Sequence, residues 1–548
     1  MSAAPRLESV GPHREVGGGA LLFAGIGSVI GSGWLFGAWR AAQLAGPGAI
    51  WAWVIGALAI LCIAASYAEL GAMFPESGGA VRYGHYSHGS LVGFLTGWAA
   101  WIAIVSVIPV EAEASVQYMS SWPWAWAQAL YRHAAGGPGE LTASGLAIAA
   151  ILVVVYFLLN YWSVRLFAGA NSAITWLKLA IPAGTAAALL AAGFHQENFH
   201  VGVHGGTHVT NVAAILTAVA TSGIVFSFNG FQSPVNLAGE ARSPGRNVPL
   251  AIFGAILLSA LIYLLLQIAF VGAVPAAQLQ QGWASLTYSS PFAQLALALN
   301  LNWLALLLYG DAFLSPSGTG TTYTATTARM LYAMERSGTA PRFLGQLHPR
   351  WGIPRGAMWV NLAVAFAFLF CFRGWGTLAA VISVATIITY LVGPVSALAL
   401  RRTAPELHRP LRIRALPLLA PLAFVVATLM LYWARWPYTG QIVLLLVVPL
   451  PVYAWYQGRS GWRALRRHLA GAAWLFAYLA AIVILSWAGS RQFDGRGYLP
   501  YGWDQLYVAL AALIFCAWGV RSGWSTPALA QNRQAQRQTR LDADGSTS

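Results

Sequence analysis

The sequence predicts an all-α polytopic membrane protein with about 14 transmembrane helices, and three observations support this class. Of its 548 residues, 58% are hydrophobic and only 9% are charged, and the mean hydropathy is +0.61. A soluble chain needs more polar surface than this, and a disordered chain needs more charge. The apolar residues also form runs of about 20, the length of helix that crosses a bilayer core of about 30 Å.

Fourteen apolar segments are predicted to cross the membrane as helices, because lipid offers an exposed backbone amide no hydrogen-bond partner. They comprise residues 21–39, 48–71, 91–112, 144–160, 173–192, 211–233, 249–274, 291–314, 357–372, 377–400, 416–434, 440–457, 470–488 and 505–520. The predicted regions are a cytoplasmic tail at 1–17, five spans at 18–195, five spans at 208–402, four accessory spans at 415–520 and a disordered cytoplasmic tail at 521–548.

The basic residues indicate the orientation of the chain. There are 31 Lys and Arg against 16 Asp and Glu. Of the 31, 24 fall in tails and loops on the N-terminal side of the predicted spans, and six fall on the opposite side: Arg40, Arg132, Arg373, Arg435, Arg491 and Arg496. Positively charged loops stay in the cytoplasm. We therefore expect a protein of the inner cell membrane with both termini cytoplasmic, and no binding of nucleic acid.

The three cysteines carry no predicted chemistry. Cys62, Cys371 and Cys516 lie far apart, each inside an apolar run, so neither a disulfide framework nor a metal-binding cluster is expected. The sequence contains no nucleophile–base pair of the kind that would indicate a membrane enzyme. It also contains no repeated selectivity-filter sequence of the kind that would indicate a channel.

Two spans contain sequences that disfavour continuous helix. The first holds Gly25-Ile-Gly-Ser-Val-Ile-Gly-Ser-Gly33, and the sixth holds Thr221-Ser-Gly-Ile-Val-Phe-Ser-Phe-Asn-Gly230. Glycine weakens a helix through its backbone entropy, although small residues also form packing faces between membrane helices. The first and sixth spans each begin a unit of five spans, and because five is odd, the second unit enters the membrane in the opposite orientation to the first. Broken helices at equivalent places in such inverted repeats are typical of secondary transporters, with the binding site between them.

The broken helices predict the chemistry of a ligand. Free amides at a half-helix N-terminus suit a carboxylate, and carbonyls released by the breaks suit an ammonium group. An α-amino acid carries both groups. Phe226, Phe228 and Phe231 are candidates for a lid, with ordinary core packing as the alternative. The predicted substrate-binding residues are Ile26, Gly27, Ile30, Gly31, Ser32, Gly33, Val225, Phe226, Ser227, Phe228 and Asn229.

Four motifs occur in order over about residues 15 to 400. They are Gly27-Ser-Val-Ile-Gly-Ser-Gly33, Ser66-Tyr-Ala-Glu-Leu70 through Pro75-Glu-Ser-Gly-Gly79, Gly239-Glu-Ala-Arg-Ser-Pro-Gly-Arg-Asn-Val-Pro249 and Ala328-Arg-Met-Leu-Tyr-Ala-Met-Glu-Arg-Ser-Gly338. Through them the chain resembles the amino acid–polyamine–organocation permeases, most closely their proton-coupled amino acid branch with its aspartate/proton symporter-like members.

This resemblance implies the five-plus-five inverted-repeat transporter fold with discontinuous helices 1 and 6. It also implies that the substrate carboxylate meets the amides of Gly31 to Gly33, and that Phe226 is the occluding gate. The sequence departs from the family at Gln232, where many relatives carry an acidic residue. Its 14 predicted spans also exceed the usual 12 by two.

Lys178 is the only lysine of the chain and lies within the fifth span, in Asn171-Ser-Ala-Ile-Thr-Trp-Leu-Lys-Leu-Ala-Ile-Pro182. An ionisable side chain inside a membrane is costly and indicates function. A desolvated lysine can exchange its proton near neutral pH, which arginine cannot. The resemblance implies that its amine lies near the unwound first span and couples proton movement to transport. The alternative is a lysine that extends to the membrane interface.

Three acidic residues are further candidates for a substrate or proton role. Glu111 and Glu113 lie in the third span, and because residues two apart face different ways on a helix, at most one is expected to line a central cavity. Asp311 precedes Ser315-Pro-Ser-Gly-Thr-Gly320, a string that predicts another local break. Positions at the membrane interface are the alternative for the two glutamates.

The predicted function is a secondary active transporter that imports an amino acid by proton symport and alternating access. The resemblance favours an acidic substrate. The expected partners are the amino acid and the lipid bilayer, and the proton is the coupling ion, with no other cofactor and no metal. An exchanger of amino acids, or of an amino acid for an amine, is the alternative within the same fold. A transporter-like nutrient sensor is the alternative from another class. The sequence leaves the oligomeric state open.

Overall fold

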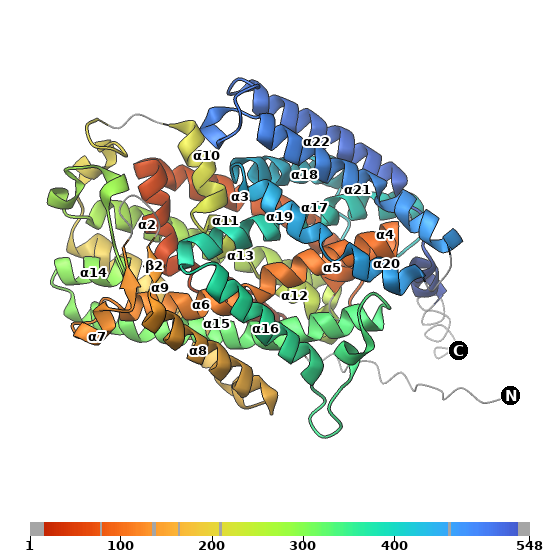
Figure 1. The fold of residues 1–548 in the computed structure, drawn as a ribbon, viewed down its shortest axis with the longest axis horizontal. Helices are drawn as coiled ribbons and strands as arrows, with labels where there is room; N and C mark the ends of the chain where they lie inside the picture. The colour runs from red at the N-terminus through yellow and green to blue at the C-terminus, as the bar shows by residue number, and fades with distance from the viewer. Residues whose placement is uncertain are drawn as a thin grey trace.

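The computed structural model describes residues 16–76, 79–133, 139–162, 165–207, 211–458 and 462–534, and these are mainly helix (Figure 1). Ten helical segments among them are long and apolar enough to cross a membrane, and shorter apolar helices lie at Gly18–Val29, Val212–Thr221 and Arg355–Cys371. The described residues contain a single sheet, formed by the two-residue strands β1 (Tyr131–Arg132) and β2 (Glu140–Leu141). The predicted all-α polytopic class is confirmed.

The first five predicted spans all contain helix. They are formed by α1 (Gly18–Val29) with α2 (Gly33–Ala45), α3 (Ala49–Met73), α5 (Ser90–Val105) with α6 (Val107–Met119), α8 (Ala143–Tyr161) and α9 (Arg165–Ala192). Two short helices outside the spans, α4 (Gly79–His88) and α7 (Ala125–Gln128), lie near opposite ends of the molecule (Figure 1). We call the end with α4 the inner end and the end with α7 the outer end.

The remaining nine spans also contain helix. They are formed by α10 (Val212–Thr221) with α11 (Ile224–Ser227) and α12 (Ser233–Asn236), α13 (Pro244–Ala273), α15 (Asn302–Arg336), α16 (Arg355–Cys371), α17 (Trp375–Thr403), α18 (Leu416–Trp433), α19 (Tyr438–Val447) with α20 (Leu450–Gly458), α21 (Trp462–Ala488) and α22 (Trp503–Ser522). The helices after α17 cover one side of the ten-span core (blue in Figure 1), where α18 packs on α17 and α3.

Equivalent spans of the two halves pack against each other. The second span, α3, contacts the seventh, α13, and the third span, through α6, contacts the eighth, α15. Both broken helices, α1/α2 and α10–α12, occupy the first position of their halves. This is the arrangement expected for an inverted repeat.

The eighth span differs from its prediction at both ends. It begins at Asn302 and not at residue 291, because Pro291–Ala298 forms the separate helix α14. The backbone of Asn300, between the two helices, is in the left-handed region with φ 59°. The break predicted near Pro316 is also wrong, since α15 continues to Arg336. Pro316 cannot donate to the carbonyl of Ala312, and the hydroxyl of Ser115 donates to that carbonyl instead, at 3.0 Å.

The predicted disordered tail is wrong for residues 523–534, which dock on the inner end. The Trp524 indole donates to the carbonyl of His88 at 3.1 Å, Thr526 Oγ1 donates to the carbonyl of Tyr86 at 2.9 Å, and Leu529 is fully buried. The polar composition of the segment indicated disorder, but its side chains donate hydrogen bonds to backbone carbonyls of α4. Residues 535–548, and residues 1–15 of the predicted N-terminal tail, lie outside the described residues.

Leu529→Ala is expected to destabilise the folded protein by about 2–5 kcal/mol, the usual cost of truncating a buried leucine. The measurement is the thermal unfolding transition of the purified protein in detergent. Gln534→Ala, at an exposed position of the same segment, is the matched control and should leave the transition unchanged. Equal transitions for the two variants would show that the segment does not dock.

Candidate functional site

The first span is broken at the predicted glycine-rich sequence. The helix α1 ends at Val29, Ile30 is extended at φ −87° and ψ 94°, and α2 begins at Gly33. A methyl group on Gly33 would overlap the hydroxyl oxygen of Ser227 and lie 3.0 Å from Ser227 Cα. The absence of a side chain at Gly33 therefore lets the two broken helices approach each other.

The sixth span is broken on both sides of the short helix α11. Gly223, before it, has φ 92°, and Gly230, after it, has φ 104°, values that L side chains rarely adopt. A side chain on Gly230 would also come within 2.7 Å of the carbonyl oxygen of Ser28. The prediction of discontinuous first and sixth spans is thus confirmed, and the two breaks face each other.

A small cavity lies between the breaks. Its volume is only about 10 Å³, and it is lined by Ser28, Val29, Gly31, Gly33, Val107, Glu111, Phe226, Asn229, Thr319 and Tyr323. Four of these residues, Gly31, Gly33, Phe226 and Asn229, belong to the predicted substrate-binding set. Ligand sites usually have about 300–1,000 Å³. The cavity is therefore in a closed form, and a bound amino acid requires it to expand.

The N-terminus of α2, predicted to receive a substrate carboxylate, binds the side chain of Glu111 instead. The backbone N–H of Ser32 lies 3.0 Å from Glu111 Oε2 and 3.3 Å from Oε1. Glu111 is fully buried. The free amides and the partial positive charge of a helix N-terminus favour such an anion. The half-helix end thus holds a carboxylate in this structure, as its chemistry predicts, but the carboxylate belongs to the protein.

Lys178 lies beside the first break. Its Nζ donates to the carbonyl of Gly27 at 2.9 Å and to Thr319 Oγ1 at 2.5 Å, and the side chain is only 3% exposed. The amine therefore points into the protein, which contradicts the alternative of an interfacial lysine. The carboxyl groups of Glu111 and Asp311 both lie within electrostatic range of it.

Two tyrosines, which sequence reasoning missed, bind carbonyls that the breaks release. Tyr263 Oη donates to the carbonyls of Val29 and Ser227 at 3.2 and 3.1 Å, and Tyr323 Oη donates to that of Ser28 at 3.1 Å. Tyrosine within a span is common, so no sequence signal marked them. The predicted carbonyl of Ile26 instead accepts the N–H of Ile30 at 2.9 Å, because it still belongs to the last turn of α1.

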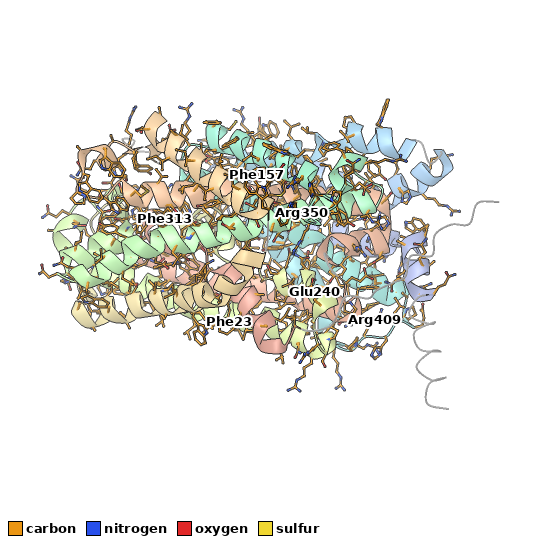
Figure 2. The ribbon with its side chains drawn as sticks, turned by 90° about the horizontal axis from the view of Figure 1, so that it is seen from below. Phe23, Phe157, Glu240, Phe313, Arg350 and Arg409 are labelled. Carbon is orange, nitrogen blue, oxygen red and sulfur yellow. The ribbon has the colours of Figure 1, made fainter. Side chains whose placement is uncertain are left out.

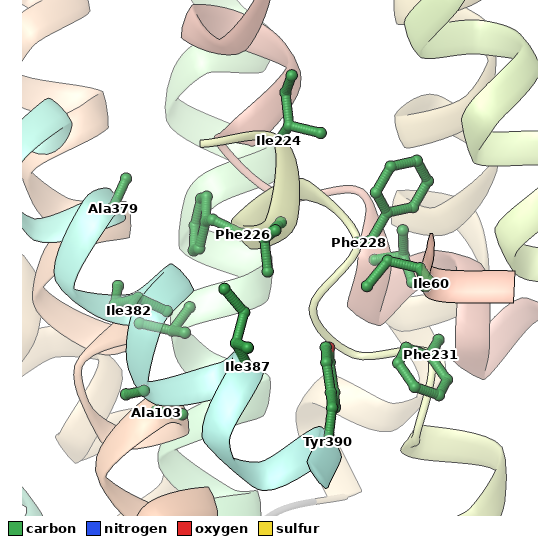
Figure 3. Close-up of a cluster of buried hydrophobic side chains, with 14 of the residues drawn as sticks. Ile60, Ala103, Ile224, Phe226, Phe228, Phe231, Ala379, Ile382, Ile387 and Tyr390 are labelled. Atoms are coloured by element: carbon green, nitrogen blue, oxygen red, sulfur yellow. The ribbon is translucent and has the colours of Figure 1, made fainter. Parts of the chain in front are cut away.

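Of the three predicted lid phenylalanines, Phe226 alone lines the cavity. Figure 3 shows Phe226 on the side of α17 and Phe228 on the opposite side, near Ile60 of α3. Phe228 packs against Tyr263 with ring centres 5.5 Å apart, and Phe231 packs against Tyr390 at 5.1 Å. Phe228, which was predicted to bind substrate, therefore does not line this closed cavity, because the chain turns between the two rings. Val225 and Ser227 likewise do not line the cavity.

Trp375, at the start of α17, is another residue that sequence reasoning missed. Its Nε1 donates to the hydroxyl of Ser32 at 2.9 Å. Its ring lies 4.8 Å from that of Phe36 and 6.0 Å, edge to face, from that of Phe226. Trp375 thus connects the first break, the phenylalanine of the sixth span and the tenth span.

Glu113 and Asp311 are buried but do not line the cavity. Neither carboxyl group has a hydrogen-bond partner among the described residues. Glu111 lines the cavity and Glu113 does not, in keeping with their two-residue spacing. Within the same part of the chain, no group of three or more His, Cys, Asp and Glu side chains is arranged to hold a metal ion.

A family comparison agrees with this geometry. The family model for amino acid permeases matches residues 19–456, which contain both broken helices. The chain belongs to this family. The predicted resemblance is therefore confirmed, and the permease is an amino acid transporter that spans the cell membrane many times, and not an enzyme.

Individual relatives of the permease are similar over almost the whole chain. The glutamate/serine transporter AimA of Bacillus subtilis (strain 168) is 54% identical over 528 residues, which are 96% of this chain and 97% of the relative. The aspartate-proton symporter of the same organism is 34% identical over 508 residues, 92% of this chain and 95% of the relative. The cationic amino acid transporter 5 of Arabidopsis thaliana is 24% identical over 456 residues, 80% of this chain and 74% of the relative.

Proposed function

We propose that this permease imports acidic amino acids together with protons, by alternating access to the cavity between the two broken helices. The carboxylate of Glu111 at the N-terminus of α2 is the observation that carries the proposal. It marks a position with chemistry suited to the carboxylate of an amino acid. The substrate carboxylate then competes with Glu111 for the amide of Ser32.

The ammonium group of the substrate is assigned to the carbonyls of Ser28, Val29 and Ser227. These carbonyls accept hydrogen bonds from Tyr263 and Tyr323 in the closed form. An ammonium group satisfies them equally well, because it supplies three donors. Substrate entry therefore exchanges tyrosine hydroxyls for the ammonium group, and Phe226 closes over the occupied site.

Proton coupling follows from Lys178 and Glu111. Once the substrate takes the amide of Ser32, Glu111 loses its hydrogen-bond donor while it remains buried, and an unpaired charge there is costly. Uptake of a proton by Glu111 removes that cost. Lys178 holds the carbonyl of Gly27, so its protonation state is coupled to the geometry of the first break.

The relatives support the substrate class. The names of the two Bacillus relatives specify glutamate and serine for one transporter and aspartate with a proton for the other. Lys178 supplies a buried cation near the cavity for a second carboxylate. The basic loops support an inner end that faces the cytoplasm, with both termini on that side.

The test is uptake by the purified full-length protein in liposomes. Labelled glutamate, aspartate, serine and a neutral branched-chain control are supplied with and without an inward proton gradient. We expect the gradient to accelerate uptake of the acidic amino acids and to concentrate them inside the vesicle. Uptake that needs an internal amino acid and ignores the gradient would identify an exchanger. No uptake of any member of the panel would contradict the assignment of substrate.

Glu111→Gln should tighten substrate binding while abolishing proton-driven accumulation. The neutral amide competes less well for the N-terminus of α2, and such an interaction is worth up to about 2 kcal/mol in buried settings, or up to about 30-fold in affinity. Binding of labelled glutamate between pH 5.5 and 8 measures both effects, because the affinity of the variant should lose its pH dependence. Glu140→Gln, at an exposed position of β2, is the control. Unchanged affinity and coupling in Glu111→Gln would contradict the competition.

A further inference from the structure

One face of α15 carries a line of buried polar side chains. Asp311, Ser315 and Thr319 are spaced four residues apart, so they lie on one face of the helix, each about 6 Å along the axis from the next. Their exposed fractions are 2%, 0% and 2%. At one end of the line, Thr319 Oγ1 accepts the hydrogen bond from Lys178.

At the other end of the line, Asp311 lacks the partners that a buried carboxylate normally has. Both of its oxygens, and the hydroxyl of Ser315, are without a hydrogen-bond partner among the described residues. Buried polar groups in native proteins are nearly always hydrogen-bonded, and an exception calls for an explanation such as a functional role or a bound water. Asp311 does not line the cavity of this closed form.

Asp311 lies between Lys178 and the outer end of the permease. Beyond it the same face of α15 continues with Leu308 and Leu304, which are buried and apolar. Phe313, two residues away, lies in the half of the molecule opposite to Arg409 of the inner end (Figure 2). Asp311 is thus the last polar group of this line, and protons reach it from the outer end when the apolar residues beyond it separate during alternating access.

Among the residues that the structure describes, the cation within electrostatic range of Asp311 is Lys178. A second ionisable group within electrostatic range of Asp311 is Tyr118 of α6. Glu111 and Asp311 both interact electrostatically with Lys178. A proton that moves between Asp311 and Lys178 therefore changes the charge beside the first break.

We propose that Asp311 delivers protons from the outer end to Lys178, with the hydroxyl of Ser315 as the relay. The inference rests on the proposed proton-coupled function. In the transfer, the O–H bond of the Asp311 carboxyl breaks and the lone pair of the neutral Lys178 amine takes up a proton. A carboxylate and an ammonium remain. Ser315 gains one proton as it donates another, and water completes the path between the three groups.

The test separates proton-driven transport from exchange, which moves no net proton. Asp311→Asn in the full-length protein is assayed in liposomes for gradient-driven uptake of labelled glutamate, for counterflow against internal glutamate and for glutamate binding. We expect the gradient-driven rate to fall at least 10-fold, with counterflow and affinity within about twofold of the unmodified protein. A pH dye inside the vesicles should report the same loss of proton entry.

Two further variants keep the test decisive. Asp311→Glu retains a carboxyl and should recover much of the gradient-driven rate, while Gly310→Ala, with no atom within 4 Å of the added carbon, should behave as the unmodified protein. Normal gradient-driven uptake by Asp311→Asn would overturn the proposal, and so would an equal loss of counterflow. If the unmodified protein shows no gradient-driven uptake, the proposed function itself fails.

Discussion

Lys178→Met is expected to abolish gradient-driven uptake, with a fall of at least about 100-fold in the initial rate. Methionine has a similar length but donates no hydrogen bond, so the carbonyl of Gly27 and the hydroxyl of Thr319 lose the amine that joins them. The variant also loses the buried amine beside the first break to which we assign proton exchange. Uptake of labelled glutamate into liposomes at several external pH values measures the effect.

Controls separate this effect from misfolding. Leu177→Met changes the neighbouring residue, whose side chain is 41% exposed on the outside of α9, and should transport normally. Lys178→Arg retains the positive charge and the hydrogen-bond donors, but arginine does not release its proton. The variant should therefore fold but fail to couple transport to the proton gradient. Acid-stimulated uptake by Lys178→Met at the normal rate would refute the role of this lysine.

Gly33→Ala should weaken substrate binding by at least about 100-fold. The added methyl group overlaps the hydroxyl oxygen of Ser227 and lies 3.0 Å from its Cα and Cβ, so the two broken helices must separate at the start of α2. The helix N-terminus that is proposed to hold the substrate carboxylate then moves away from the sixth span. Equilibrium binding of labelled glutamate to the purified protein measures the change.

The matched control is Gly19→Ala in α1, where an added methyl group meets no atom within 4 Å. It makes the same chemical change at a place without close contacts and should bind glutamate normally. A Gly33→Ala variant whose affinity stays within threefold of the unmodified protein would contradict the assigned site. Thermal unfolding of both variants in detergent shows whether a loss of binding reflects a loss of fold.

The fold was largely predictable because each span satisfies its own backbone. A run of about 20 apolar residues must be helical in lipid, and this local requirement placed a helix in all fourteen predicted spans. The two breaks were also local, since they follow from glycines such as Gly33 and Gly223. The errors occurred where the local structure depends on a residue far away in the sequence. Ser115 supports the α15 helix at Pro316, and the C-terminal tail docks on α4.

The candidate site was predictable only in part. Residues of the breaks, such as Gly31, Phe226 and Asn229, do line the cavity, and the lysine does lie beside the first break. Sequence reasoning missed Tyr263, Tyr323 and Trp375, which reach the breaks from other helices.

The amino-acid sequence by itself determined the class of protein, the positions of its helices and the two places where they break. These depend on interactions within a few residues, namely backbone hydrogen bonds and glycine conformation. Only the tertiary structure decided which groups bind at the breaks. The bond from Ser32 to Glu111 joins residues 79 apart and that from Tyr323 to Ser28 joins residues 295 apart. Local periodicity does not specify such pairs, because they form only when the helices pack.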